Sequence, residues 1–177
     1  IDKVFGALPA KGDLRPVPDV NVSGLGQRLI TDVNVPQAVM IFGGPGLARN
    51  DKDFMAAYIA NHILGGGSFS SRLYREVREK RGLAYGVNTS LAWFAHAAVT
   101  IGSTQVRADR TGDALNIITE EVKRMADSGP TADELAKAKS YLKGSYVLGL
   151  DTSSKIAAQL LQIQNDNLGM DYITRRD

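Results

Sequence analysis

The first clear pattern of apolar and polar positions runs over residues 28–34, where Leu29 and Val33 fall on the side opposite to the charged residues. Such alternation predicts a half-exposed strand. Beyond Pro36 the run AVMIF is apolar on both faces, so we expect the strand to become buried there. Proline cannot donate a ladder hydrogen bond and favours a sheet edge or a bulge. The GGPG that follows predicts the end of the strand.

Helical periodicity and turn residues then predict two helices, a β-hairpin and three more helices. The predicted ranges are 52–64 and 70–80 for the first two helices, 83–94 and 97–106 for the hairpin strands, 108–126 for a long helix, and segments beginning at Thr131 and near Ser153 for the last two. Regular strand–helix–strand alternation is missing. The order therefore predicts an α+β fold with two layers, a mostly antiparallel β-sheet packed on helices.

Local signals support the first two helices. Asn50 or Asp51 can cap the first of them, and the glycines at 65–67 are expected to end it. In the second helix Leu73 and Val77 stand one turn apart, so both are expected to face inward.

The later helices carry signals of their own. Thr131 and Glu134 form a capping box, in which each side chain binds the other residue's backbone N–H. Helical spacing places apolar stripes on the long helix and on the one after it. Their members are Leu115, Ile118, Val122 and Met125, and then Leu135, Ala138 and Leu142.

Composition narrows the function. The chain has 177 residues, 44% of them hydrophobic, which suits one domain with a core. A net charge of only +2 argues against a nucleic-acid partner. No cysteine is present, which excludes thiol chemistry, disulfides and Cys-ligated zinc. His62 and His96 lack the paired spacing of a zinc hydrolase, so no metal site is predicted, and no apolar run approaches the length of a membrane span.

The N-terminal residues 1–20 are rich in proline and glycine and lack periodicity. We interpret them as a linker from a preceding domain, with the domain itself over residues 21–177. Because the chain begins at Ile1 and ends without a stop signal, we expect a piece of a longer protein, truncated at the C-terminal end of this domain. A secretion signal would precede Ile1, so the compartment, periplasm or cytoplasm, stays open.

The stretch LGGGSFSSRLYREVREKRGLAYGV, residues 64–87, holds the candidate chemistry. A P-loop would need a lysine after the glycines, and a dinucleotide fingerprint would need a strand before them; both are missing. An anion site at the N-terminus of the following helix is an alternative. A tight turn between two helices, closed by a serine cap, explains the same residues more simply.

Five basic residues crowd this stretch: Arg72, Arg75, Arg78, Lys80 and Arg81. Their spacing predicts a solvated helix face with Glu–Arg pairs, and aromatic residues for base stacking are too few to favour nucleic acid. Arg78 and Tyr85 differ from the rest, because Arg78 lies two helical turns before a tyrosine that opens a strand. A fixed positive charge and a neutral donor can together hold a carbonyl oxygen.

This stretch, with the upstream VPQAVMIFGGPGLARNDKDFMAAYIANHILGGG, resembles the C-terminal domain of M16 peptidases, a family that includes pitrilysin, insulysin and the mitochondrial processing peptidase. The similarity spans about residues 35–106. It implies the LuxS/M16 metallohydrolase-like fold, without zinc ligands of its own. In the family the zinc motif HxxEH belongs to an N-terminal unit. Zinc is therefore expected in an N-terminal M16 domain or in a zinc-bearing M16 partner subunit.

The resemblance also implies roles for individual residues. Arg78 and Tyr85 match the family's catalytic pair, in which the tyrosine donates to the scissile carbonyl or its oxyanion and the arginine orients the peptide while a zinc-activated water attacks. The family's metal-free processing subunit is thought to contact substrate through its glycine-rich stretch. The implied substrate-binding residues here are Gly65, Gly66, Gly67, Ser68 and Phe69.

The resemblance thus implies a C-terminal domain that binds peptide and assists catalysis in an M16-type zinc metallopeptidase, inactive as a fragment. The zinc motif would lie upstream in the same polypeptide or in a separate protein, and FGGPGLARND followed by an intact Arg–Tyr pair is similar to the metal-free subunits of bacterial pairs. A non-catalytic M16-like scaffold or assembly subunit is the alternative. An anion- or nucleic-acid-binding module is a third, which the near-balanced charge disfavours.

Overall fold

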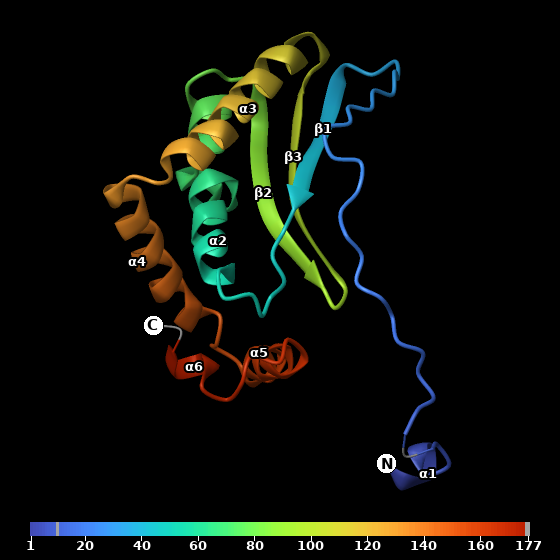
Figure 1. Ribbon diagram of the computed structural model, residues 1–177. Coiled ribbons are helices and arrows are strands. Elements are labelled where there is room, and N and C mark those ends of the chain that lie inside the picture. Colours follow the sequence, from blue (N-terminus) through green and yellow to red (C-terminus); the bar gives the residue numbers. More distant parts are fainter. Residues whose placement is uncertain (10, 176–177) are drawn as a thin grey trace.

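The computed structural model describes residues 1–9 and 11–175 and has the expected α+β architecture (Figure 1). Short π- or 3₁₀-helical segments are labelled η. The bounds are α1 Asp2–Phe5, β1 Gln37–Pro45, α2 Phe54–Asn61, η1 His62–Gly66, η2 Ser68–Ser70, η3 Tyr74–Glu79, β2 Ala84–Phe94, β3 Ala97–Arg107, η4 Ala108–Arg110, α3 Thr111–Ser128, α4 Ala132–Leu148, α5 Ser153–Asn165 and α6 Tyr172–Arg175.

The three strands form one antiparallel sheet in the order β1-β3-β2. The central strand β3 pairs with β1 from Gln37 opposite Arg107 onward, and β2 reaches it through the predicted hairpin turn at Ala95 and His96. Pro36 precedes an edge strand of the described sheet, as expected of a residue without a donor. Helices α2, α3 and α4 lie on one side of the sheet (Figure 1).

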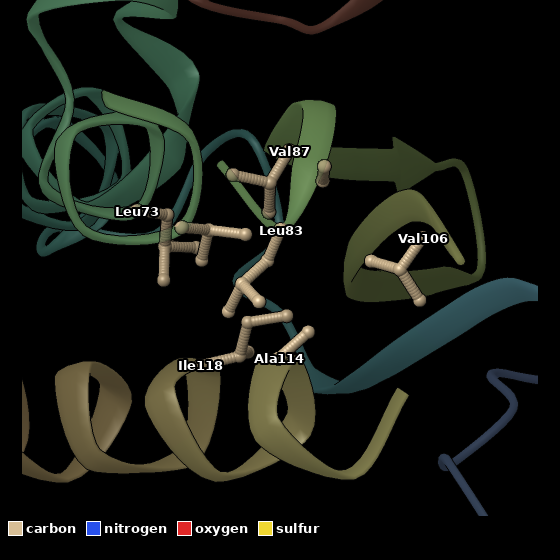
Figure 2. Packing of buried hydrophobic residues seen from close by; sticks show 8 residues of the cluster. Leu73, Leu83, Val87, Val106, Ala114 and Ile118 are labelled. Atoms are coloured by element: carbon tan, nitrogen blue, oxygen red, sulfur yellow. The ribbon is translucent and has the colours of Figure 1, made fainter. Parts of the chain in front are cut away.

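The core lies where η3, the start of β2 and α3 meet. Leu73 and Val77 are completely buried, which confirms the predicted inward face of that helix. Figure 2 shows Leu73 and Leu83 turned toward Ile118 of α3. Burying a side chain of this size stabilises the fold by about 1.5–3 kcal/mol. The elements that carry Arg78 and Tyr85 are therefore anchored in the core.

Strand β1 is buried on one face only, so the expectation of burial on both faces was wrong. Val39 is 65% exposed and Ile41 is 75% exposed, whereas Ala38, Met40 and Phe42 pack against the core. Helices cover a single side of the sheet, which leaves the other side open. The apolar residues on the open side border the candidate site.

The half-exposed strand predicted over residues 28–34 is not formed. This segment has no regular structure and makes no ladder hydrogen bond among the described residues, and Leu29 and Ile30 remain 89% and 75% exposed. Alternation marks a segment that can pair, but pairing also needs an edge within hydrogen-bond distance. The paired strand begins at Gln37 and continues through the glycines to Pro45, beyond its predicted end.

The first helix begins later than predicted and ends in a π-helical turn. Its N-cap is Asp53, whose backbone N–H donates to Asp51 Oδ1 at 2.8 Å. At its C-terminal end the chain continues into η1, a wide turn that includes Gly65 and Gly66, and stops only at Gly67. The helical turns thus end within the glycines at 65–67, as predicted.

Helix α3 differs from its predicted stripe at one position. Ile118 is buried as expected, but Val122 is 42% exposed, while Glu121 is only 7% exposed. Glu121 forms an ion pair with Arg124 on its own helix and interacts electrostatically with the buried Arg72. Because the charged Arg72 is buried nearby, the carboxylate of Glu121 occupies the inward position on α3.

Helix α4 begins with the predicted capping box. The Glu134 backbone N–H donates to Thr131 Oγ1 at 3.2 Å, and the Thr131 backbone N–H donates to Glu134 Oε2 at 2.9 Å. The expected stripe is also present, with Ala138 buried and Leu135 and Leu142 half-buried. Both the predicted capping box and the predicted apolar stripe of α4 are therefore confirmed.

The described part of residues 1–35 contains only α1 as regular structure and is mostly exposed. It touches the rest of the fold at the hairpin turn, where the Val20 backbone N–H donates to the His96 carbonyl at 2.8 Å and Asp19 lies 3.0 Å from the His96 ring. The assignment of residues 1–20 as a linker stays a prediction. Among the described helices, none combines the length and apolarity needed to cross a membrane.

Candidate active site on the open face of the sheet

Four of the five basic residues around η3 are paired with carboxylates. Arg72 and Arg75 contact Glu134 at 2.6 and 3.5 Å, and Lys80 and Arg81 each contact Glu76 at 2.6 Å. The predicted close-range pairing is thus found at Glu76, whereas Arg72 and Arg75 pair with the distant Glu134 of α4. Arg72 and Glu76 are also buried rather than solvated. Arg78 alone of the five has no acidic partner within the described chain.

Arg78 instead lies between two aromatic rings. Its guanidinium carbon is 4.9 Å from the ring centre of Tyr85 and 5.1 Å from that of Tyr74. Its Nη1 also donates a hydrogen bond to the Tyr74 hydroxyl. Cation–π contact of this kind holds an arginine without neutralising its charge. The sequence-predicted pair of Arg78 and Tyr85 is therefore brought together with the guanidinium still available.

Tyr85 occupies a β-bulge at the start of β2. Ala84 pairs opposite Val106 and Val87 pairs opposite Thr104, so β2 has one residue more than β3 between these two pairs. Ala84 and Val87 are consequently both buried, while Tyr85 is 86% exposed. Bulges of this type re-aim side chains and occur often beside active sites.

The chain reaches this bulge through a tight turn after η3. Gly82 has a φ of +60°, which favours glycine, and its backbone N–H donates to the Arg78 carbonyl at 2.8 Å. The Leu83 backbone N–H donates to the Val77 carbonyl at 2.9 Å. Because the turn closes directly on the η3 backbone, it fixes Tyr85 beside Arg78.

A hollow of about 520 Å³ opens over the exposed face of the sheet at this point. Its walls come from β1, the glycine-rich turn, η3, β2 and β3. The lining residues are Val39, Ile41, Ser68, Phe69, Tyr74, Arg78, Tyr85, Gly86, Val87, Asn88, Ser103, Thr104 and Gln105. Arg78 is the one charged residue of this set, so the hollow offers a single cation among apolar groups and neutral hydrogen-bonding groups.

The glycine-rich turn divides into two parts. Gly65 is buried, and a Cβ there would lie 2.5 Å from Thr89 Oγ1, so glycine is needed for close packing on β2. Gly66 and Gly67 likewise lie close to Asn61 and His62. None of the three lines the hollow, and their predicted contact with substrate stays a prediction.

Ser68 and Phe69, in contrast, line the hollow. Phe69 is 70% exposed and lies edge-on against Tyr74, with ring centres 5.0 Å apart. Ser68 has a φ of +48°, an uncommon conformation for a residue with a side chain. Its carbonyl accepts hydrogen bonds from the backbone and side chain of Ser71, which hold the turn at the rim.

Sequence reasoning missed Tyr74 and the walls contributed by β1 and β3. Tyr74 stands four residues before Arg78, a spacing that places both on one face of a helix. Val39 and Ile41 alternate along β1 on the side away from the helices, a signal that the apolar composition of that strand hides.

No group of three or more histidine, cysteine, aspartate or glutamate side chains in the described ranges is arranged to hold a metal ion. His62 stacks on Tyr141 of α4 with ring centres 5.3 Å apart, and burial lowers its pKa. His96 pairs with Asp19 at the hairpin turn. Among the described residues, neither histidine therefore belongs to a cluster of potential metal ligands.

The chain is similar in sequence to two bacterial proteins. It is 42% identical over 120 residues to a protein of Streptomyces coelicolor named "Uncharacterized zinc protease SCO5738", a match that covers 68% of this chain and 26% of that protein. It is 32% identical over 119 residues to the "Non-peptidase homolog YmxG" of Helicobacter pylori, with 67% and 27% covered. The matched region spans about a quarter of the length of each relative.

A solved structure and a family model agree with these relatives. The crystal structure of a peptidase M16 inactive domain from Pseudomonas fluorescens is 33% identical and superposes with a TM-score of 0.73, covering 78% of this chain and 33% of that one. The family model described as the peptidase M16 inactive domain matches residues 1–142. The chain belongs to the peptidase M16 family, in its inactive-domain class.

Proposed function

We propose that this chain is the zinc-free C-terminal unit of an M16-type metallopeptidase, and that it binds and polarises a peptide whose bond is cleaved with zinc held elsewhere. An N-terminal M16 domain or a zinc-bearing partner subunit would supply the metal. The Streptomyces coelicolor relative named as a zinc protease supports this class of reaction, and it is several times longer than the matched region.

Two side chains would act on the substrate. The Tyr85 hydroxyl donates a hydrogen bond to the scissile carbonyl oxygen, and this bond strengthens as negative charge develops there. Arg78 contributes a fixed positive charge that orients the peptide backbone. Ser68 and Phe69 lie at the rim of the hollow and contact the neighbouring part of the peptide. Gly65 packs closely against Thr89 of β2, and Gly66 and Gly67 lie close to Asn61 and His62.

One observation carries the proposal: Arg78 has no acidic partner in the part of the chain that the structure describes, and it stacks on the exposed ring of Tyr85 at the edge of the hollow. An arginine kept only for stability normally gains from a carboxylate, and the neighbouring Arg72 has one. A cation held by aromatic faces keeps its charge for a ligand.

The test is Tyr85→Phe in the full-length protein, assayed with its zinc-bearing domain or partner on an internally quenched peptide library with randomised central residues. Removing one donor to a developing oxyanion is expected to lower kcat about 10²-fold, with a smaller change in KM. Tyr58→Phe is a matched control, because Tyr58 packs on Phe54, away from the hollow, and should leave kcat unchanged. Unchanged kcat in Tyr85→Phe would remove Tyr85 from the reaction.

A scaffold role is the second candidate. It is favoured by the relative named a non-peptidase homolog, which is 32% identical to this chain. Under that alternative the full-length protein, alone or with any zinc-bearing M16 protein encoded beside it, would not hydrolyse the library. Metal-dependent hydrolysis that is lost in Tyr85→Phe would exclude the scaffold role.

A further inference from the structure

We propose that Tyr74 is a positioning residue that sets the guanidinium of Arg78 against the ring of Tyr85. The inference rests on the proposed function and deepens it, because it identifies what holds the substrate-facing arginine in place. Tyr74 does not need to touch the peptide for this role; it acts through Arg78.

Tyr74 is itself fixed firmly. It is only 7% exposed, Phe69 lies edge-on against its ring, and its helix is anchored by the completely buried Leu73 and Val77. Its hydroxyl accepts the hydrogen bond from Arg78 Nη1. Tyr74 is therefore held in place by its neighbours, and its hydroxyl orients the longer side chain of Arg78.

The arrangement restricts Arg78 in two ways. The hydrogen bond to Tyr74 fixes one edge of the guanidinium, and the rings of Tyr74 and Tyr85 lie 5.1 and 4.9 Å from its central carbon. An arginine without such restraint loses considerable rotamer freedom when it binds a ligand. Fixing it in advance lowers that cost in the substrate complex.

The hydroxyl also protects the charge of Arg78. A carboxylate in its place would neutralise the guanidinium, as Glu134 does for Arg72. A phenol accepts the hydrogen bond and stays neutral, so the positive charge remains directed at the hollow. Tyrosine is thus suited to this position in a way that phenylalanine and glutamate are not.

The experiment is a double-mutant cycle in the full-length protein with its zinc-bearing domain or partner, using the same quenched peptide library. Tyr74→Phe keeps the ring and removes the hydroxyl; it is expected to lower kcat/KM about tenfold, the magnitude of one hydrogen bond to a charged group. In the Arg78→Ala background the same substitution should change kcat/KM by less than about twofold, because Tyr74 acts only through Arg78. Tyr141→Phe, on α4 and outside the hollow, is the matched control and should have no effect.

The outcomes separate the two proposals. If Arg78→Ala and Tyr85→Phe impair turnover but Tyr74→Phe does not, the positioning role is wrong and the proposed function stands. A tenfold loss from Tyr74→Phe in both backgrounds would reveal a structural or direct role, which also overturns the inference. If none of the three substitutions changes turnover, the proposed function itself fails.

A second measurement does not depend on activity. Crystal structures of the full-length protein and of its Tyr74→Phe variant would be compared at Arg78. We expect an ordered guanidinium over the Tyr85 ring in the parent protein and a displaced or poorly ordered one in the variant, with η3 unchanged. An unmoved guanidinium in the variant would overturn the inference even if no peptide is cleaved.

Discussion

Arg72 and Arg78 show how neighbours decide what an arginine does. Both belong to the same basic stretch, and their spacing in the sequence does not distinguish one from the other. Arg72 is 3% exposed, and Glu134 neutralises it through two hydrogen bonds of 2.6 and 2.8 Å. The Arg78 guanidinium lies against the rings of Tyr74 and Tyr85 and has no acidic partner among the described residues. Sequence periodicity identifies the face of a helix, but it does not reveal which cation a distant carboxylate will neutralise.

Glu134 serves both the capping box and Arg72, and this makes it sensitive to acid. The hydrogen bond from Arg72 is the main cause that lowers its pKa from 4.5 to about 2. A carboxylate with a depressed pKa stabilises the fold fully above its unfolded pKa, and the stabilisation is lost as pH falls through the folded value. Glu134→Gln should therefore flatten the fall in unfolding free energy between about pH 4.5 and about pH 2.

Urea unfolding of the chain at several pH values in that interval would check this. Asp133→Asn is the control, because Asp133 pairs with Lys137 in an exposed contact and should leave the slope nearly unchanged. Glu76 still titrates in both variants, since Lys80 and Arg81 lower its pKa, so a residual slope is expected. An identical slope in Glu134→Gln and the parent chain would contradict this account of Glu134.

At the scale of elements, the sequence predicted the caps and turns that depend on neighbouring residues. The capping box at Thr131 and the hairpin turn between residues 94 and 97 are confirmed because each depends on residues next to it in sequence. The strand predicted at 28–34 is absent, because a strand depends on a partner that its own sequence does not specify. The bulge at Tyr85 also escaped prediction, since it is defined by register against β3.

The glycine-rich turn gives a test at this scale. Gly65→Ala should destabilise the chain by about 1–3 kcal/mol, because its Cβ would lie 2.5 Å from Thr89 Oγ1 and 2.9 Å from the Thr89 backbone nitrogen. Gly144→Ala is the matched control. Gly144 lies inside α4 with nothing near a new Cβ, so alanine should stabilise the helix by about 0.5–1 kcal/mol.

Denaturant unfolding of the two variants would measure both changes. If Gly65→Ala left stability unchanged and lowered only the affinity of the full-length protein for peptide, Gly65 would be a substrate contact, as the family resemblance implies. Loss of stability identifies a packing role for this glycine.

At the scale of the whole molecule, Arg49 joins segments far apart in sequence. Its guanidinium lies 4.4 Å from the ring centre of Phe54 and 5.1 Å from that of Tyr172, and it donates to the Tyr172 hydroxyl at 2.6 Å. Asp166 is 3.9 Å away, and the ring centre of Trp93 on β2 is 5.9 Å away. This one side chain connects the loop before α2 and the end of β2 with the C-terminal helices.

Arg49→Ala should therefore loosen α5 and α6 while the sheet stays protected, because cation–π contacts and the hydrogen bond are lost together. Hydrogen exchange followed by mass spectrometry would show faster exchange over residues 153–175 and little change in β2 and β3. Arg110→Ala, which removes an exposed pair with Asp113, should leave the pattern unchanged. Equal exchange in Arg49→Ala and the parent would show that Arg49 does not hold these helices.

The central claim is that Arg78 and Tyr85 act as a unit on one bound peptide, with Arg78 orienting its backbone and Tyr85 donating to the scissile carbonyl oxygen. A double-mutant cycle with Arg78→Ala and Tyr85→Phe in the full-length protein, with its zinc source, tests it most directly through kcat/KM for the quenched peptide library. Groups that act as a unit are strongly non-additive, so the double variant should be little worse than the more impaired single variant. Losses that simply multiply, or that are absent, would contradict the account.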